Sequence, residues 1–374
     1  MKKSVVFIYF FVVLLGTSCA QVSDKGINLP KTIDFTVEPI ITGIQNPWGM
    51  AFLPNGGILV TEKSGELLLH ANGETIKIGN IPGNLYTRGQ GGFMDIVLHP
   101  NYRENGWIYF SFASSEGEQK GGNTAIFRSK LSKNELVQTQ LLYKAEPNST
   151  KGQHFGSRLE FDKKGYLYFS IGDRGDRDIN PQDITKDCGK IYRLHDDGHI
   201  PNDNPFIGKT GAKTAIFSYG HRNPQGLTLH PETGQLWEHE HGPRGGDEIN
   251  IIQKGKNYGW PVITYGINYS GTKITDETSR PGMEQPIYQW TPSIGPSGMT
   301  FVSSDKYPKW KGNLLAGSLS FQYLERMVIE NNKVVYREKL LDGMGRVRNV
   351  KQAPDGFIYV GIEGKGVYKL VPDM

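Results

Sequence analysis

Six copies of one short pattern constrain the fold of this chain more than any other feature of its sequence. Each copy is an apolar strand, a turn that usually contains Pro, Asp or Gly, and a second apolar strand. The copies cover residues 50–60, 96–110, 159–168, 226–237, 299–315 and 350–360. Such units, repeated at intervals of tens of residues with loops of variable length, are typical of a β-propeller, in which every blade repeats one strand meander. The sequence therefore predicts an all-β protein, a six-bladed β-propeller.

Length and composition agree with one large all-β body. The chain has 374 residues, with 47 Gly and 18 Tyr, and no long segment has the 3.6-residue apolar period of an amphipathic helix. No Ser/Pro-rich or charged linker divides it. The formal net charge is only +4 and the basic residues are scattered. Because nucleic-acid binding needs a basic patch, we expect no nucleic-acid partner.

The N-terminus is typical of an export signal. A basic start precedes an apolar run, Val5 to Leu15, that is too short to span a bilayer. Cys19 then lies where a bacterial lipoprotein signal has its lipidated cysteine, and the alternative is ordinary cleavage near Ala20. We expect residues 1–19 to be the export signal, 20–34 a tether and 35–374 the propeller domain. The protein would be periplasmic or anchored to the cell envelope, with a lipid on Cys19 as its one membrane contact.

The densest group of polar side chains falls in residues 219–250. In a propeller, the loops over one mouth of the central channel build the functional site. Gly242 and Pro243 could direct two backbone oxygens at a cation, and Asp247 and Glu248 could add carboxylate oxygens. Calcium prefers such hard oxygen ligands. The alternative is a turn whose carboxylates only accept hydrogen bonds from backbone amides.

His154 and Asp173 flank the third repeat, with His154 before its first strand and Asp173 after its second. A hairpin could bring the two side chains together. An imidazole oriented by a carboxylate is the usual build of a general base, because the acid fixes the tautomer and stabilises the imidazolium.

Arg346 and Arg348 lie two residues apart beside the sixth repeat. Residues two apart in a strand point to the same face. Two guanidinium groups on one face suit an anionic, planar polycarboxylate, which they can bind in a bidentate manner. The alternative is a solvated edge strand.

Taken together, these segments resemble the soluble quinoprotein sugar dehydrogenases of the glucose/sorbosone dehydrogenase family, and in particular its aldose sugar dehydrogenase branch. The similarity runs from about Val37 to Leu370. The matching motifs are residues 46–50, 88–92, 220–226, 241–243, 247–250, 257–261 and 346–348.

The resemblance implies a propeller that binds pyrroloquinoline quinone (PQQ) over the channel mouth, with Ca²⁺ bridging cofactor and protein. The substrate would be an aldose sugar, and an external acceptor would take the electrons. His154 would remove the proton of the anomeric hydroxyl while hydride passes from that carbon to the quinone, and Asp173 would orient His154. Arg222 and Asn223 would contact the quinone oxygens, where negative charge develops.

The resemblance also implies the remaining cofactor and metal contacts. Backbone oxygens of Gly242 and Pro243 would bind calcium, with Asp247 and Glu248 in or near its outer shell. The cofactor's carboxylates would be held by Gln90, Arg346 and Arg348, and the predicted cofactor contacts also include His154, His241 and Ser293. Ser320 stands where relatives often carry a lysine near the cofactor, so a positive charge is missing there. The chain also lacks room for the insertions of the glucose-selective subgroup, which favours broad aldose specificity.

Two other functions fit a propeller of this kind. A calcium-dependent hydrolase of lactones or esters would hold its ion deep in the channel with side chains from several blades, whereas here the candidate ligands cluster in one loop. A non-catalytic binding propeller would be expected to lose His154 or the arginine pair, and both are present. The tryptophans, including Trp260, are interpreted as packing between blades, and His221 as structural.

Overall fold

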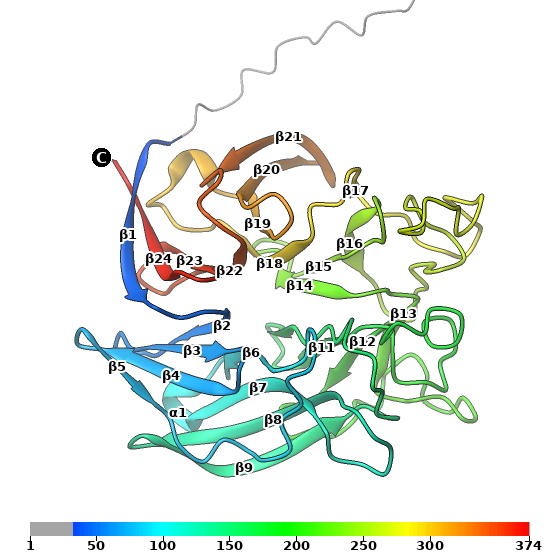
Figure 1. Cartoon of the computed structure of the whole chain (residues 1–374), viewed down its shortest axis with the longest axis horizontal. Coiled ribbons are helices and arrows are strands. Elements are labelled where there is room, and N and C mark those ends of the chain that lie inside the picture. Colours follow the sequence, from blue (N-terminus) through cyan, green and yellow to red (C-terminus); the bar gives the residue numbers. More distant parts are fainter. Residues whose placement is uncertain (1–32, 374) are drawn as a thin grey trace, which may run out of the picture. The chain divides into compact units, whose positions relative to one another are not determined.

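The computed structural model describes residues 33–373, which form strands, turns and loops with very little helix. Twenty-four strands make six four-stranded antiparallel sheets, and Figure 1 shows these sheets arranged as blades around a centre. The prediction of an all-β, six-bladed propeller is confirmed.

Five blades are built from consecutive strands. Blade 1 contains β2 (Pro47–Phe52), β3 (Ile58–Glu62), β4 (Glu66–Ala71) and β5 (Glu74–Lys77). Blade 2 contains β6 (Phe93–Leu98), β7 (Trp107–Ser114), β8 (Asn123–Ser132) and β9 (Glu135–Lys144). Blade 3 contains β10 (Leu159–Phe161), β11 (Leu167–Ile171), β12 (Lys190–Leu194) and β13 (Ile216–Tyr219). Blade 4 contains β14 (Pro224–Leu229), β15 (Leu236–Glu240), β16 (Asp247–Ile252) and β17 (Tyr288–Trp290). Blade 5 contains β18 (Pro296–Phe301), β19 (Leu314–Ser318), β20 (Leu324–Glu330) and β21 (Lys333–Leu340).

Blade 6 closes the ring with strands from both ends of the domain. It contains β22 (Val347–Gln352), β23 (Ile358–Ile362), β24 (Gly366–Pro372) and β1 (Phe35–Thr42). Figure 1 shows β1, in blue, beside β24, in red, and their register pairs Phe35 with Pro372 and Thr42 with Gly366. Ile33, just before β1, already packs into the apolar core of this blade. The outermost strand of the last blade thus ties the start of the described chain to its end.

Each predicted repeat covers the first and second strand of one blade. The first strands of neighbouring blades contact one another and form the inner ring. These strands are buried on both faces, as β18 is along its whole length, whereas the outer strand β5 is exposed along its whole length. A strand buried on both faces needs a continuous apolar run, which is why the inner part of each blade gives the clear sequence signal.

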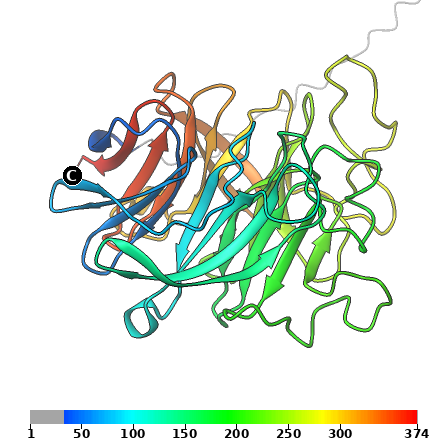
Figure 2. The ribbon, with the colours of Figure 1, turned by 60° about the horizontal axis from the view of Figure 1, so that its bottom comes forward.

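Two short helical turns interrupt the strands: α1 (Tyr102–Asn105) between β6 and β7, and a 3₁₀ turn (Pro308–Trp310) between β18 and β19. The longest excursion is the segment between β16 and β17, which extends beyond its blade in yellow in Figure 2. Among residues 33–373, no helix is both long and apolar enough to cross a membrane. The predicted export signal, Cys19 and most of the tether lie outside the described residues.

Arg158, at the start of β10, joins several blades across the channel. Its guanidinium lies 3.5 Å from Asp95, 4.0 Å above the Trp48 ring, and donates to the backbone oxygens of Gln225 at 2.6 Å and Arg348 at 3.1 Å. The side chain is almost fully buried. One cation therefore links five blades at the centre of the ring.

Candidate active site

Two cavities lie side by side at one mouth of the channel, where they share Pro243 and Tyr269 as lining residues. The first, which we name the arginine cavity, has a volume of about 380 Å³ and is lined by Arg346 and Arg348. The second, the histidine cavity, has a volume of about 460 Å³ and is lined by His154. Of the predicted site residues, the arginine cavity brings together Gln90, His241, Gly242, Pro243, Asp247, Ser293, Arg346 and Arg348. The histidine cavity brings together His154, Asp173, Arg222 and Pro243.

The β10–β11 hairpin places His154 against Asp173, as the sequence predicts. His154 Nδ1 lies 2.7 Å from Asp173 Oδ1, and the backbone N–H of His154 donates to Gln90 Oε1 at 2.7 Å. His154 has a left-handed backbone with φ of 56°, a conformation that neighbouring contacts must hold in place for a non-glycine residue. Gly172 permits this approach, because a Cβ there would come within 2.3 Å of the His154 carbonyl oxygen.

Further donors fix the Asp173 carboxylate. Trp260 Nε1 donates to Oδ2 at 2.9 Å, and the backbone N–H of Gly175 donates to Oδ1 at 2.7 Å. The Asp173 side chain is 1% exposed and that of His154 is 12% exposed. The acid is thus buried and held from several sides, while the imidazole reaches the cavity.

Burial is the largest influence on the protonation of both groups. It lowers the pKa of His154, and the charge of Arg222 lowers it further, although Asp173 partly opposes this. Burial alone would raise the pKa of Asp173, but the hydrogen bond and charge of His154, the Arg222 charge and the Gly175 amide together lower it. His154 is therefore neutral at neutral pH, with its proton on Nδ1 toward the carboxylate and a free lone pair on Nε2.

Arg222 and Asn223 lie immediately before β14, beside this pair. Arg222 Nη1 donates to the backbone oxygens of His241 at 2.8 Å and Gly242 at 2.7 Å, and its guanidinium lies 5.4 Å from the centre of the Trp260 ring. These contacts fix a positive charge at the wall of the histidine cavity.

Asn223 has a donor without a partner. Its Oδ1 accepts from the Gly156 N–H at 3.1 Å, while its buried Nδ2 has no hydrogen-bond partner among the described residues. A buried donor left unpaired costs about 1–3 kcal/mol. Asn223 lines neither cavity. The feature that fits a cofactor with carbonyl oxygens is therefore the fixed guanidinium of Arg222 at the wall of the histidine cavity.

From the sequence, the loop between β15 and β16 could be a calcium site or a turn whose carboxylates accept hydrogen bonds from backbone amides. It has features of both. Asp247 Oδ1 accepts from the Gly242 N–H and Oδ2 from the Gly295 N–H, each at 2.8 Å, so this carboxylate does bond backbone amides. Burial raises the pKa of Asp247 to about 6. The Pro243 carbonyl accepts from Ser293 Oγ at 3.1 Å. The Gly242 and Pro243 carbonyls each have a second lone pair, so both remain able to bind a cation.

His241 and Glu248 extend from the same loop in different directions. His241 Nε2 lies 2.7 Å from the Pro296 carbonyl oxygen and donates to it, and burial lowers the pKa of His241 well below its ordinary value. Asp247 and Glu248 are consecutive residues of β16 and point to opposite faces. Asp247 lines the arginine cavity, whereas Glu248 lines a separate small space beside Tyr258. The structure therefore does not bring the two carboxylates together.

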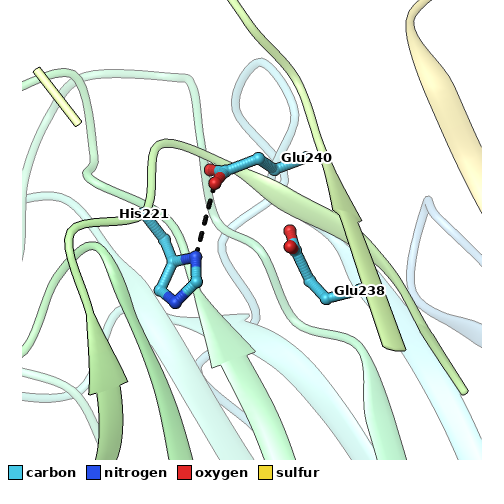
Figure 3. A group of neighbouring side chains, drawn as sticks. All are labelled: His221, Glu238 and Glu240. Atoms are coloured by element: carbon cyan, nitrogen blue, oxygen red, sulfur yellow. Dashed lines mark hydrogen bonds and ion pairs between the residues drawn. The ribbon is translucent and has the colours of Figure 1, made fainter. Parts of the chain in front are cut away.

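Glu248 belongs to a buried acidic group on that other face. Figure 3 shows three of its neighbours, His221, Glu238 and Glu240, whose ligand atoms all lie within 4.8 Å of one another. His221 Nδ1 lies 3.3 Å from Glu240 Oε1, and its ring stacks on Tyr258 at 4.6 Å. These contacts agree with the interpretation of His221 as structural. Burial raises the pKa of Glu238 and of Glu248 well above the ordinary range.

Glu240 connects this group to the candidate site. Its Oε2 accepts from the backbone N–H of Arg222, and from that of Asn223 at 3.3 Å. The carboxylate thereby fixes the backbone that presents Arg222 and Asn223. Sequence reasoning did not single out Glu240, because no local pattern links it to residues eighteen positions earlier.

The arginine pair shares one acidic partner. Arg346 Nε donates to Glu363 Oε2 at 2.5 Å and Arg348 Nε to Glu363 Oε1 at 2.8 Å, so both guanidinium groups face the same side, as predicted. Arg348 lies in β22, the inner strand of its blade, and Arg346 immediately precedes that strand. The Arg346 side chain is 45% exposed, but that of Arg348 is only 12% exposed, which excludes a fully solvated edge strand. Ser320 lines the same cavity.

Three residues of the two cavities escaped the sequence analysis. Glu363 lies in the turn between β23 and β24 and its role depends on pairing across that turn. Lys63 lies in the equivalent turn of blade 1 and lines the arginine cavity. Trp260 was interpreted as packing between blades, and this was wrong for its indole N–H, which holds Asp173. The one available signal was the position of Trp260 in a motif shared with the family.

The fold and the site together define a class: a six-bladed propeller with an imidazole–carboxylate pair and an arginine-lined cavity at one channel mouth. The chain belongs to the Glucose / Sorbosone dehydrogenase family, whose model matches residues 44–369. The resemblance noted from the sequence is confirmed.

Several relatives make the comparison more specific. The aldose sugar dehydrogenase YliI of Escherichia coli (strain K12) is 42% identical over 339 residues, which are 88% of this chain and 90% of the relative. The crystal structure of the soluble aldose sugar dehydrogenase from Escherichia coli in its apo form has a TM-score of 0.86 at 38% identity, covering 91% of this chain and 100% of that chain. The PQQ-bound aldose sugar dehydrogenase of Streptomyces coelicolor has a TM-score of 0.74 at 26% identity, covering 91% and 99%. The prediction of an enzyme of the sugar dehydrogenase class is confirmed.

Proposed function

We propose that this chain oxidises the anomeric carbon of aldose sugars to lactones, with pyrroloquinoline quinone as hydride acceptor and His154 as general base. The observation that carries the proposal is the neutral imidazole of His154, oriented by Asp173 and directed into a cavity that adjoins the arginine cavity. The PQQ-bound relative supports the choice of cofactor.

His154 moves the proton in this reaction. Its Nε2 accepts the proton of the sugar's anomeric hydroxyl, and Asp173 stabilises the imidazolium that forms. The C1–H bond breaks with its electron pair, and the C1–O1 bond becomes the lactone carbonyl, so the sugar loses one proton and one hydride. When bound, the quinone supplies the two-electron acceptor for that hydride.

Arg222 lines the histidine cavity, and its charge would stabilise the negative charge that develops on the quinone. Its guanidinium would donate to the quinone oxygens, and such a preorganised donor costs no reorganisation during the reaction. Arg346, Arg348 and Gln90 would hold the carboxylates, and His241 and Ser293 would line the remaining wall.

Calcium would be held by the carbonyl oxygens of Gly242 and Pro243, with Asp247 beside them. The donor set is one of hard oxygens, which suits Ca²⁺. Glu248 lies on the opposite face of β16 and is left out of this shell. A hydrolase with calcium deep in the channel is disfavoured, because the candidate oxygen ligands Gly242, Pro243 and Asp247 come from one segment at the channel mouth and not from several blades.

The test is a titration of the full chain, purified without cofactor, with PQQ and Ca²⁺. Reduction of an electron-accepting dye would be measured with a panel of aldoses. We expect saturable, calcium-dependent activity that disappears in His154→Ala. Absence of PQQ binding by calorimetry in a folded protein would overturn the proposal.

We also propose that the chain is exported and anchored through a lipid on Cys19. The basic and apolar character of residues 1–19 supports this. Metabolic labelling with a palmitate analogue should label the wild type and not Cys19→Ser. Equal absence of label in both, with secretion of a soluble form, would favour ordinary cleavage near Ala20.

A further inference from the structure

The arginine cavity contains one cation that has no hydrogen bond or ion pair within residues 33–373. Arg346 and Arg348 share Glu363. Lys63, in the turn between β3 and β4, lines the same cavity, yet its ammonium group has no hydrogen bond or ion pair within residues 33–373. Of the two carboxylates that line this cavity, Glu363 pairs with both arginines and Asp247 accepts from backbone amides, so Lys63 is left without an ion-pair partner among the described residues.

Two other lysines with comparable or greater burial do find acceptors. The buried Lys190 Nζ donates to the backbone oxygens of Asn180 at 2.6 Å and Cys188 at 2.7 Å. The half-buried Lys144 Nζ donates to the Ala145 oxygen at 2.9 Å and Asn148 Oδ1 at 2.7 Å. These two lysines are stabilised by such acceptors, because desolvating an ammonium group without partners is unfavourable.

The backbone of Lys63 is held in place by neighbouring segments, so the base of its side chain stays at the cavity wall. The Lys63 N–H donates to the Asn46 oxygen and its carbonyl accepts from the Phe93 N–H, both at 3.2 Å. Gly92 packs so closely that a Cβ there would come within 2.1 Å of the Lys63 oxygen. The start of blade 2 thereby holds the turn of blade 1 against the cavity.

The electrostatic surroundings also favour an incoming anion. Burial lowers the pKa of Lys63, and the charge of Arg348 lowers it further, while Glu363 and Glu62 oppose this only partly. Like charges in a partly desolvated space repel one another. A ligand with two or more carboxylates would remove that repulsion and supply the missing acceptors.

We propose that Lys63 is a third cationic ligand of the cofactor's carboxylate groups, beside Arg346 and Arg348. The inference rests on the proposed function, since it concerns how the same cofactor is held. The two arginines offer planar forks in a fixed arrangement, whereas a lysine offers a compact charge with three donors on a flexible stem. Lys63 would therefore adjust to the carboxylate oxygens that the arginines leave free.

The test compares Lys63→Met with the wild type and with Lys365→Met, each as the full chain. Lys365 is an exposed lysine in the β23–β24 turn that does not line the cavity, so it controls for the loss of one nearby charge. PQQ would be titrated in the presence of Ca²⁺ at low and high salt, with binding followed by calorimetry. We expect Lys63→Met to bind PQQ roughly tenfold more weakly, with a shallower dependence on salt. Lys365→Met should bind as the wild type does.

Amine acylation provides a second readout that does not depend on turnover. Lys63 of the wild type should react with an acetylating reagent at pH 8, and saturation with PQQ should protect it, as measured by mass spectrometry of the digested protein. If the wild type binds no PQQ, the proposed function itself fails. If the wild type binds PQQ but Lys63→Met binds equally well and Lys63 stays unprotected, the inference about Lys63 is overturned while the proposed function stands.

Discussion

The histidine cavity and the arginine cavity adjoin each other but balance their charges in different ways. In the histidine cavity, His154 Nδ1 lies 2.7 Å from Asp173 Oδ1. The Asp173 carboxylate also accepts hydrogen bonds from Trp260 and Gly175. In the arginine cavity, one carboxylate serves two arginines and Lys63 has no partner within residues 33–373.

The difference shows how each cavity would act. A pair whose partners are all satisfied holds one geometry and one tautomer, as proton transfer requires. A surplus of positive charge instead creates affinity for an anion. Changes to His154 and its partner Asp173 should therefore alter turnover, and changes in the arginine cavity should alter cofactor affinity.

Replacing His154 with Gln removes the proposed general base from the histidine cavity. Glutamine keeps a polar side chain of similar size but cannot accept the proton, so we expect kcat to fall by roughly 10²–10⁴-fold, the usual contribution of a general base. Cofactor affinity should change far less. Steady-state kinetics at saturating PQQ and calorimetry of PQQ binding measure the two effects. A fall in affinity as large as the fall in kcat would mean that the two cavities are not separable.

Asp173→Asn should lower turnover by roughly 10²-fold and shift its pH dependence. The base acts when neutral, so activity is present above the pKa of His154 and is lost as the pH falls through it. Asp173 raises that pKa, so its removal should move the acid limb of kcat/KM to lower pH while the plateau drops. A pH profile from 4.5 to 8 measures both changes. An unchanged acid limb would show that His154 is not the group titrating there.

Arg348→Met tests the arginine cavity by removing a charged ligand. Hydrogen bonds to charged groups contribute about 1.5–3 kcal/mol, so PQQ affinity should fall by roughly 10–100-fold, with little change in kcat once PQQ is saturating. Arg128→Met is a suitable control, because Arg128 binds Gln140 and the Asp196 backbone and lines neither cavity. A large fall in kcat at saturating PQQ would contradict the separation of roles.

The repeats were sufficient to predict the six blades, because inner strands buried on both faces leave continuous apolar runs in the sequence. They could not predict that β1 completes blade 6, since the pairing of β1 with β24 joins segments more than 300 residues apart in the chain. Hydrogen bonding across that distance leaves no local pattern in either segment.

In the candidate site, too, contacts between residues close in sequence could be predicted, and contacts between distant segments could not. The spacing of Arg346 and Arg348 predicted one shared face, and the hairpin argument predicted the approach of His154 to Asp173. The adjacent carboxylates Asp247 and Glu248 were grouped at one metal, although consecutive strand residues point to opposite faces. The partners that hold the site lie on other segments, as Trp260 does for Asp173, and a single sequence does not reveal them.

Trp260→Phe tests whether the indole N–H supports the His154–Asp173 pair, and we expect it to change kcat less than the other variants. Phenylalanine keeps the aromatic face toward Arg222 but removes the N–H donor to Asp173. A neutral hydrogen bond contributes about 0.5–1.5 kcal/mol, so kcat should fall by roughly threefold to tenfold. With one donor fewer, the Asp173 charge acts more strongly on His154 and raises its pKa, so the acid limb should move to higher pH, opposite to the shift in Asp173→Asn.

Trp237→Phe is the matched control, because Trp237 is fully buried and its Nε1 has no partner among the described residues. If both Trp variants changed kcat equally, or if Trp260→Phe moved the limb in the same direction as Asp173→Asn, the indole would act through packing and not through the carboxylate.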